Sequence, residues 1–202
     1  MIAFRHPYST NSEERKIVPG GLAVLALFTS FAITGLFHIF KLEPPPQVDV
    51  TSVLALYGLY YWLFKKFWWK WQWLRTVGIV STPILEGSWA GTIQRTQPPS
   101  YSYVPDDNKV VVKIGQDWNE IVVRLDGAHS HSRSVSAAIT VSEDETSLNY
   151  EYISEPYAHA VEGMNIHYGT ARLTLKDGKL VGDYYTGRGR LTTGTIQLHR
   201  KN

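Results

Sequence analysis

The C-terminal half of this chain contains arginines and tyrosines whose positions on predicted strands favour a common binding site. Guanidinium groups pair bidentately with phosphate, and tyrosine rings stack on nucleobases of any identity. These side chains therefore suit a nucleotide or another planar anion; the alternative is that Arg188 and Arg190 are exposed residues of a glycine-rich loop. The candidate ligand-binding residues are Arg95, Tyr150, Tyr152, Tyr184, Thr186, Arg188 and Arg190.

A second group of reactive side chains lies between Asp126 and Ser132. It contains His129 and His131 with the H-x-H spacing of some metal ligands. A zinc or catalytic site needs further ligands, or a base held rigidly beside a nucleophile. Here the residues crowd one turn, so a solvated hairpin turn is favoured. With no cysteine, Walker loop, H-E-x-x-H or G-x-S-x-G motif in the chain, we expect a protein that is not an enzyme, without metal or cofactor.

The elements that position the arginines and tyrosines are predicted strands, because beyond residue 86 apolar residues recur with a period of two. No helical stretch separates them, so parallel βαβ units are excluded. Asp177-Gly178 predicts a type I′ hairpin turn. We expect an eight-stranded antiparallel up-and-down β-barrel, with a sandwich as the alternative. The predicted strands are 87–96, 109–116, 119–126, 133–142, 147–154, 167–176, 179–190 and 194–201.

Alternation along these strands predicts which side chains face inward. The same alternation can be continued to the ends of the first and seventh strands, where the candidate arginines lie. In a closed barrel these strand ends come near each other, so the arginines are expected at one mouth of the barrel. A bulge would reverse the pattern, and Gly187 and Gly189 could accommodate one. The predicted interior consists of Trp89, Gly91, Ile93, Ile121, Val123, Leu125, Val135, Ala137, Ile139, Val141, Leu148, Tyr150, Tyr152, Gly169, Ala171, Leu173, Leu175, Leu180, Gly182, Tyr184, Ile196 and Leu198.

The N-terminal third is apolar enough to enter a membrane. Residues 17–40 contain no Asp, Glu, Lys or Arg, and a helix of that length crosses the roughly 30 Å hydrocarbon layer. Residues 50–64 are also uncharged, and ten of the seventeen residues in 57–73 are aromatic, as at a membrane interface. We predict a lead-in (1–16), a first transmembrane helix (17–40), a periplasmic turn (41–49), a second transmembrane helix with an interfacial extension (50–74), a linker (75–85) and the barrel (86–202).

Small or polar residues form a stripe along the first predicted helix. Ala26, Ser30, Thr34 and His38 recur every four positions, and such a stripe allows a second helix to approach closely. The stripe packs against the second helix of the same chain, contacts a helix of another protomer, or lines a pore once several protomers assemble.

Charge is divided unevenly between the two parts. Residues 1–75 hold eight Lys/Arg and four Asp/Glu, whereas residues 76–202 hold twelve and fourteen. A domain that grips long nucleic acid has the opposite balance, so we expect no such partner. Basic residues precede the first helix and follow the second, and only Lys41 lies in the turn. The positive-inside rule then places both termini and the barrel in the cytoplasm.

The order of these parts resembles a known family. Two predicted membrane helices precede a Trp89-x-Gly91 strand, and the chain ends with Leu180-Val-Gly-Asp-Tyr-Tyr-Thr-Gly-Arg-Gly-Arg190 and Gly194-Thr-Ile-Gln-Leu198. This resembles the SMODS-associating two-transmembrane, β-strand-rich effectors of bacterial CBASS anti-phage systems. The resemblance implies a multi-pass inner-membrane protein whose barrel binds a cyclic di- or oligonucleotide from a CD-NTase-type nucleotidyltransferase. It further implies homo-oligomerisation of the helices, disruption of the lipid bilayer and abortive infection.

Two other functions remain open. The chain could be a membrane-tethered, lipocalin-like barrel for an apolar or lipid ligand, or a structural interaction module. The polarity of the barrel interior distinguishes them: inward arginines favour a nucleotide, an apolar cavity favours a lipid, and a filled barrel favours the module.

Overall fold

The computed structural model describes residues 4–41, 50–96, 108–158, 165–187 and 192–201, and the chain divides into two compact units. One unit spans residues 12–81, and the other joins residues 1–11 to residues 82–202.

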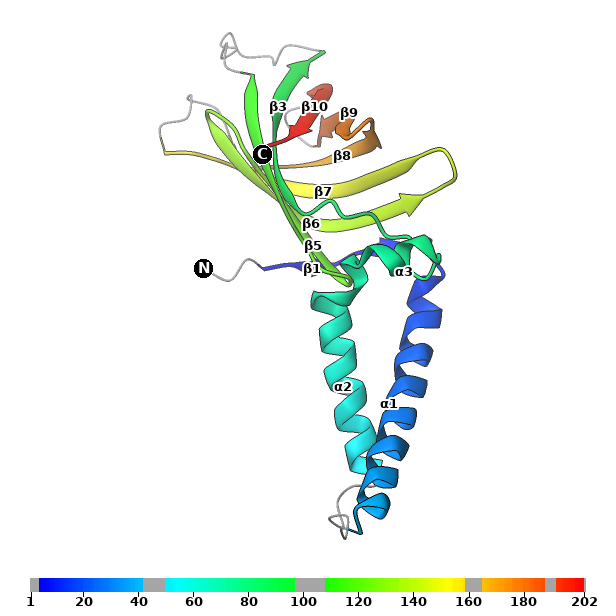
Figure 1. Cartoon of the computed structure of the whole chain (residues 1–202). Helices are drawn as coiled ribbons and strands as arrows, with labels where there is room; N and C mark the ends of the chain where they lie inside the picture. The colour runs from blue at the N-terminus through cyan, green and yellow to red at the C-terminus, as the bar shows by residue number, and fades with distance from the viewer. Residues whose placement is uncertain (1–3, 42–49, 97–107, 159–164, 188–191, 202) are drawn as a thin grey trace. The chain divides into compact units, whose positions relative to one another are not determined.

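The larger unit is a β-barrel (Figure 1). Within the described residues its eight long strands coincide with the eight predicted ones to within a few residues at each end. They are β3 (Gly87–Arg95), β4 (Lys109–Gln116), β5 (Glu120–Asp126), β6 (Ser130–Val141), β7 (Thr146–Pro156), β8 (His167–Lys176), β9 (Lys179–Thr186) and β10 (Thr193–Arg200).

Two strand pairings, β10 with β3 and β5 with β6, complete the closed barrel. Each strand pairs antiparallel with the strand that follows it in the chain, and β10 also pairs antiparallel with β3, from Gly194 opposite Arg95 to Arg200 opposite Trp89. The strands β5 and β6 complete the circle, although only three residue pairs join them, from Arg124–Arg133 to Asp126–His131. The predicted closed antiparallel barrel is therefore confirmed, and the alternative of two packed sheets is excluded.

The N-terminal residues are part of this barrel, which the sequence did not predict. Strand β1 (His6–Pro7) pairs antiparallel with β5, and strand β2 (Ser9–Thr10) pairs parallel with β6. The lead-in expected over residues 1–16 is thus not a plain tail. Beyond their three shared pairs, β5 and β6 leave backbone groups that need hydrogen-bond partners, and β1 and β2 provide them.

The interior follows the predicted alternation with one exception. The core cluster includes Trp89, Ile121, Leu148 and most of the other residues predicted to face inward. Val135 was predicted inside but is 41% exposed. The register between β6 and β7 shifts between Ser134 and Ser136, so an extra residue interrupts the alternation there. The structure therefore has a bulge on β6, where the sequence did not predict one, while Gly189 lies outside the described residues.

Glycines supply a turn and a close strand contact. Asp177 and Gly178 have φ values of 51° and 73°, as a type I′ turn requires at both central residues. This prediction is confirmed. A Cβ atom on Gly182 would collide with the backbone carbonyl of Arg172 on β8.

The second unit consists of helices. They are α1 (Glu14–Ile39), α2 (Val50–Lys66), the 3-10 helix η1 (Trp68–Lys70) and α3 (Gln72–Thr76). Helix α1 begins three residues before the predicted start. The segment expected to be one helix over 50–74 is divided instead, because the backbone leaves the helical conformation at Phe67, with φ −127° and ψ −54°, and again at Trp71, with φ −66° and ψ 130°.

Helices α1 and α2 contact each other through hydroxyl-bearing side chains. Ser30 Oγ lies 3.3 Å from Ser52 Oγ, and the Tyr60 hydroxyl donates to Thr29 Oγ1 at 3.1 Å. Ala26 and Ser30 of the predicted stripe are buried. At these two positions, the stripe therefore packs within the chain.

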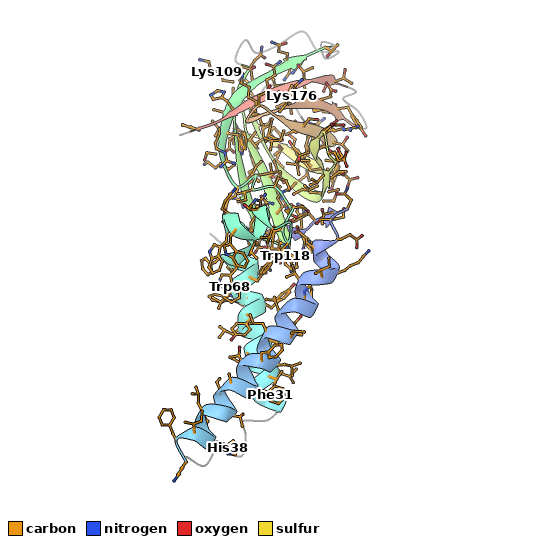
Figure 2. All side chains as sticks on the ribbon, turned by 45° about the vertical axis from the view of Figure 1, so that its right-hand side comes forward. Phe31, His38, Trp68, Lys109, Trp118 and Lys176 are labelled. Carbon is orange, nitrogen blue, oxygen red and sulfur yellow. The ribbon has the colours of Figure 1, made fainter. Side chains whose placement is uncertain are left out.

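Among the described helices, α1 is the one that is long and apolar enough to cross a membrane. Only 17% of its most apolar 18-residue window is buried. Figure 2 shows Phe31 projecting from the helix, and this side chain is 73% exposed. Helix α2 has 17 residues, so the structure provides one clear spanning helix where the sequence predicted two.

Candidate functional site

One end of the barrel interior contains a partly open pocket with a volume of about 130 Å³. Residues of all eight long strands, from β3 to β10, line it together with the turn between β5 and β6. Five of the seven candidate residues predicted from the sequence line it together: Arg95, Tyr150, Tyr152, Tyr184 and Thr186. Arg188 and Arg190 lie outside the described residues.

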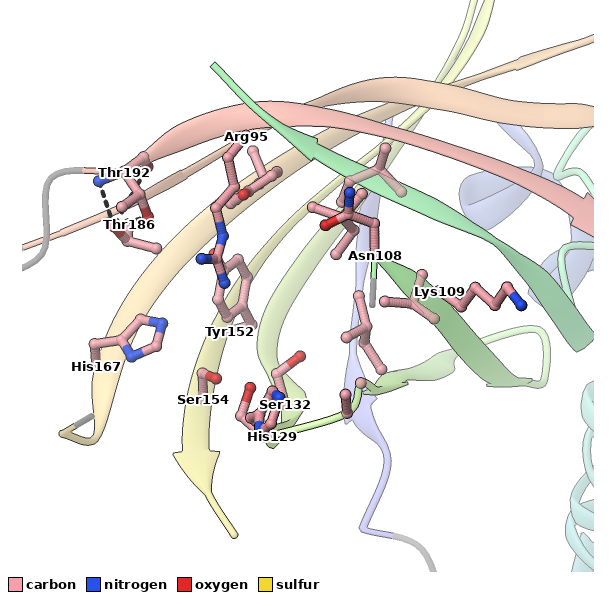
Figure 3. A pocket seen from close by; sticks show the side chains of 18 of the residues that line it. Arg95, Asn108, Lys109, His129, Ser132, Tyr152, Ser154, His167, Thr186 and Thr192 are labelled. Carbon is pink, nitrogen blue, oxygen red and sulfur yellow. Dashed lines mark hydrogen bonds between the residues drawn. The ribbon is translucent and has the colours of Figure 1, made fainter. Parts of the chain in front are cut away.

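Arg95 is the principal cationic group of the pocket. It is the last residue of β3, and Figure 3 shows its guanidinium directed toward Tyr152, in a space bordered by Ser154, His129 and His167. Its Nη1 atom is buried and has no hydrogen-bond partner among the described residues. A buried guanidinium nitrogen without an acceptor is energetically costly, so this atom is ready to donate to an anion.

Three tyrosines form the aromatic part of the wall. Tyr150, Tyr152 and Tyr184 are each less than a tenth exposed, and the rings of Tyr150 and Tyr152 are 6.1 Å apart. Burial raises the pKa of the Tyr150 hydroxyl far above its ordinary value, because the phenolate would lose its hydration. All three side chains face the barrel interior, as strand alternation in the sequence predicted.

Glycines on neighbouring strands make room for two of these rings. Gly169 lies opposite Tyr152, and Gly194 lies opposite Tyr184. A Cβ atom on Gly169 would collide with the Tyr152 ring, and one on Gly194 would lie 2.6 Å from Cε1 of Tyr184. The two glycines therefore leave the space that these tyrosine rings occupy.

Thr186 is part of the wall, but its hydroxyl is already used. The Thr192 amide donates to Thr186 Oγ1 at 2.8 Å, and the two hydroxyl oxygens are 2.9 Å apart. The Thr186 amide also donates to the Thr192 carbonyl at 2.9 Å. These bonds tie together the ends of the segment that contains Arg188 and Arg190. Thr186 thus acts as a structural clasp.

We expect Thr186→Val to destabilise the barrel by about 1–3 kcal/mol, because it leaves a buried amide and hydroxyl of Thr192 without their partner. Chemical denaturation of the purified chain measures this cost. Thr174→Val is the matched control, since the Thr174 hydroxyl bonds Glu145 at an exposed position. Equal stability of the two variants would contradict the role of the clasp.

Sequence reasoning missed several pocket residues. The segment 126–132, interpreted from the sequence as a solvated turn, lines the pocket with Gly127, Ala128 and His129 of the turn and with Ser130 and Ser132 at the start of β6. Asn108, Ser154 and His167 also line it. Strand alternation could have identified Ser154, because it follows Tyr150 and Tyr152 at every second position of β7 and so faces the same side. Within the described residues there is no group of three or more His, Asp or Glu side chains that could hold a metal.

The charged side chains among the described lining residues are all basic. None of these nineteen residues is Asp or Glu, whereas Arg95 and Lys109 are cationic. The residues from 76 onward nevertheless contain more acidic than basic side chains. The described lining of the pocket is therefore basic although the domain as a whole is mildly acidic.

Comparison with known proteins agrees with this geometry. A family model described as "Cap15, cyclic dinucleotide receptor domain" matches residues 80–200. The chain belongs to the Cap15 family of CBASS effectors. This confirms the family resemblance found in the sequence, and the matched Cap15 domain coincides with the barrel strands from β3 to β10.

Two Cap15 relatives, both called CD-NTase-associated protein 15, extend the match. The protein from Yersinia aleksiciae is 29% identical over 195 residues, which cover 89% of this chain and 88% of the relative. The protein from Staphylococcus schleiferi is 28% identical over 138 residues, which cover 68% of this chain and 70% of the relative. The first similarity includes the helical part of the chain as well as the Cap15 barrel.

Proposed function

We propose that the chain is a non-catalytic membrane effector that senses a cyclic dinucleotide through the pocket around Arg95. The observation that carries this proposal is a buried Arg95 guanidinium nitrogen that has no hydrogen-bond partner among the described residues and faces a pocket whose described lining contains no Asp or Glu. Membership in a family of cyclic dinucleotide receptor domains supports the same ligand class.

Different pocket residues bind different parts of the ligand. Arg95 donates charge-assisted hydrogen bonds to a phosphate, while Tyr152 and Tyr184 offer ring surface to a base. The volume of about 130 Å³ is below the range of about 300–1,000 Å³ typical of pockets for drug-sized ligands. The enclosed space therefore takes one part of the ligand, and the remainder extends through the open side of the pocket.

Polarity disfavours the alternative of an apolar ligand. A lipid chain in this cavity would leave Arg95, Ser132 and Ser154 facing hydrocarbon, at the cost of burying polar groups without partners. The presence of the cavity itself disfavours a purely structural module with a filled barrel.

The helices form the membrane part of the proposed mechanism. Eight residues of α1 are large, apolar and more than two-fifths exposed: Ile17, Val24, Leu25, Leu27, Phe28, Phe31, Leu36 and Ile39. Such an exposed surface is expected of a helix in lipid. We place α1 and α2 in the bacterial inner membrane as two spans, with the aromatic residues of α2 and η1 at the cytoplasmic interface.

Ligand binding is coupled to the membrane by association of protomers. A partner nucleotidyltransferase of the CD-NTase type supplies the cyclic nucleotide, and the occupied barrel favours an oligomer whose helices disrupt the bilayer. Occupancy shifts this equilibrium only if the ligand binds the associated state more tightly. Since Ser30 is used within the chain, the contact between protomers is made by the exposed faces, which include Phe28 and Phe31.

Titration of the purified full chain in detergent with cyclic di-AMP, cyclic di-GMP and cyclic UMP–AMP tests the proposal. At least one should bind with a micromolar or lower Kd and release dye from liposomes that contain the protein. Binding of fatty acid but of no cyclic nucleotide would support the lipocalin-like alternative. An adjacent nucleotidyltransferase gene would be the matching genomic observation.

We predict that both termini are cytoplasmic, because seven of the eight basic residues in 1–75 lie outside the turn that contains Lys41. Reporter fusions placed after Asn202 and within Pro44–Pro46 should report opposite compartments. A periplasmic signal from the fusion after Asn202 would exclude a cytosolic ligand.

A further inference from the structure

The wall of the receptor barrel is completed by residues that lie outside the matched receptor domain. That domain begins at residue 80, yet β1 and β2 come from residues 6–10. They pair with β5 and β6 at the seam where those two strands share only three residue pairs. The receptor is therefore discontinuous in sequence, and α1 and α2 lie between its two pieces along the chain.

His6 is joined to the point where the seam opens. Its Nε2 atom lies 2.7 Å from Ser134 Oγ, and the same hydroxyl accepts a hydrogen bond from the Val123 amide at 2.9 Å. Ser134 is buried and lies at the β6 bulge. Its side chain thus holds β5, β6 and the N-terminal segment together at one point.

Two further residues anchor the segment. Tyr8 is 7% exposed, belongs to the barrel core, and donates its hydroxyl to the Trp118 carbonyl at 2.8 Å. The Asn11 amide group donates to the Val141 carbonyl at 2.8 Å and accepts from the Val141 amide at 2.9 Å. Asn11 therefore makes the pair of bonds that a neighbouring strand would make.

The seam is also the part of the wall next to the pocket. Its three residue pairs lead directly into the turn whose residues Gly127 and His129 line the cavity. Ser132 lines the cavity too, and it lies two positions from Ser134, which contacts His6. A ligand in the pocket thus touches the strand that holds the N-terminal segment.

The other end of the segment continues into the membrane helix. Helix α1 begins at Glu14, three positions after Asn11. We infer that residues 4–11 form an N-terminal strap that is held in the β5–β6 seam and transmits ligand occupancy from the pocket to α1. The transmission of ligand occupancy rests on the proposed function, whereas the position of the strap in the β5–β6 seam does not.

A disulfide cross-link tests the seating without any ligand. The chain has no cysteine, and Ser9 is the register partner of Ala138 on β6. Neighbouring strands are about 4.8 Å apart, within the Cα separation of about 4.4–6.8 Å that disulfides accept.

We expect the full-length Ser9→Cys/Ala138→Cys variant to form an intramolecular disulfide in most molecules on mild oxidation, as measured by peptide mass spectrometry. The control is Ser9→Cys/Lys176→Cys, because β6 and β7 separate β2 from β8, and it should remain reduced. Equal cross-linking of both variants, or of neither, would overturn the seated strap.

Substitution of His6 tests the transmission. His6 is not among the residues that line the pocket, so His6→Ala should change the Kd for the cyclic dinucleotide in detergent by less than about threefold, while ligand-triggered dye release falls by about tenfold. His6→Gln can restore a hydrogen bond to Ser134 and should recover the release. The probes are cyclic di-AMP, cyclic di-GMP and cyclic UMP–AMP.

The strap has no role in transmission if His6→Ala releases dye as the wild type does, or if the variant loses ligand affinity and dye release by the same factor. If none of the probes binds the wild type, the proposed function fails, and the cross-link still decides whether the strap is seated.

Discussion

Arg95→Ala should weaken binding of a cyclic dinucleotide by about tenfold to a hundredfold, since a hydrogen bond to a charged group contributes roughly 1.5–3 kcal/mol. Arg95 supplies the buried guanidinium nitrogen that has no partner among the described residues, so its loss removes binding energy without breaking an observed contact. Calorimetric titration of the full chain in detergent measures the change. Ligand-dependent dye release should shift to higher concentration by the same factor.

Lys109→Ala is the matched control for Arg95. Lys109 also lines the pocket, but Figure 3 shows its side chain directed away from Arg95 and Tyr152. Removing its charge should weaken binding by no more than about threefold, because an exposed charge is screened by solvent. If the two variants lose affinity equally, the ligand is attracted by net charge and not by a specific Arg95 contact.

Trp89→Ala should destabilise the barrel by about 3–5 kcal/mol, the usual cost of removing a large, fully buried side chain. Trp89 is 1% exposed, and its indole nitrogen donates to the Leu85 carbonyl at 3.0 Å. The Arg200 guanidinium also lies 4.9 Å from the ring centre, so the substitution removes a cation–π contact as well. Urea denaturation followed by far-ultraviolet circular dichroism measures the free energy of unfolding.

Tyr185→Ala provides the comparison for Trp89, because Tyr185 is an aromatic residue on β9 that is 57% exposed. Its replacement should cost less than about 1 kcal/mol. A near-neutral result for Trp89→Ala would mean that the core does not depend on this ring, and that the inward parity of β3 is wrong.

The barrel was predictable from the sequence because its signals are local. A period of two in apolar residues follows from the pleat of a strand, so residues such as Ile121 and Leu148 indicate their own burial. The Asp177-Gly178 turn is equally local, since two positive φ values favour these residues. Once the first strand is known to neighbour the last, the same parity brings Arg95 and Tyr184 into one pocket.

The helical part was predicted less fully. Hydropathy identified α1, because an uncharged run of sufficient length is itself the signal. Aromatic content extended the second predicted helix to residue 74, but composition does not reveal a backbone break, and α2 ends at Lys66. The partner of the Ala26–Ser30 stripe was likewise undetermined until Ser30 was found beside Ser52.

Tertiary structure decided the features that depend on residues far apart in the chain. The β6 bulge exposes Val135, because the register with β7 shifts there. The insertion of His6 between β5 and β6 depends on a seam that only barrel closure creates. His129 became a pocket residue because the turn between β5 and β6 lies against the open end of the barrel. Strand alternation thus determines which side a residue faces, whereas the contacts between distant strands determine what it meets there.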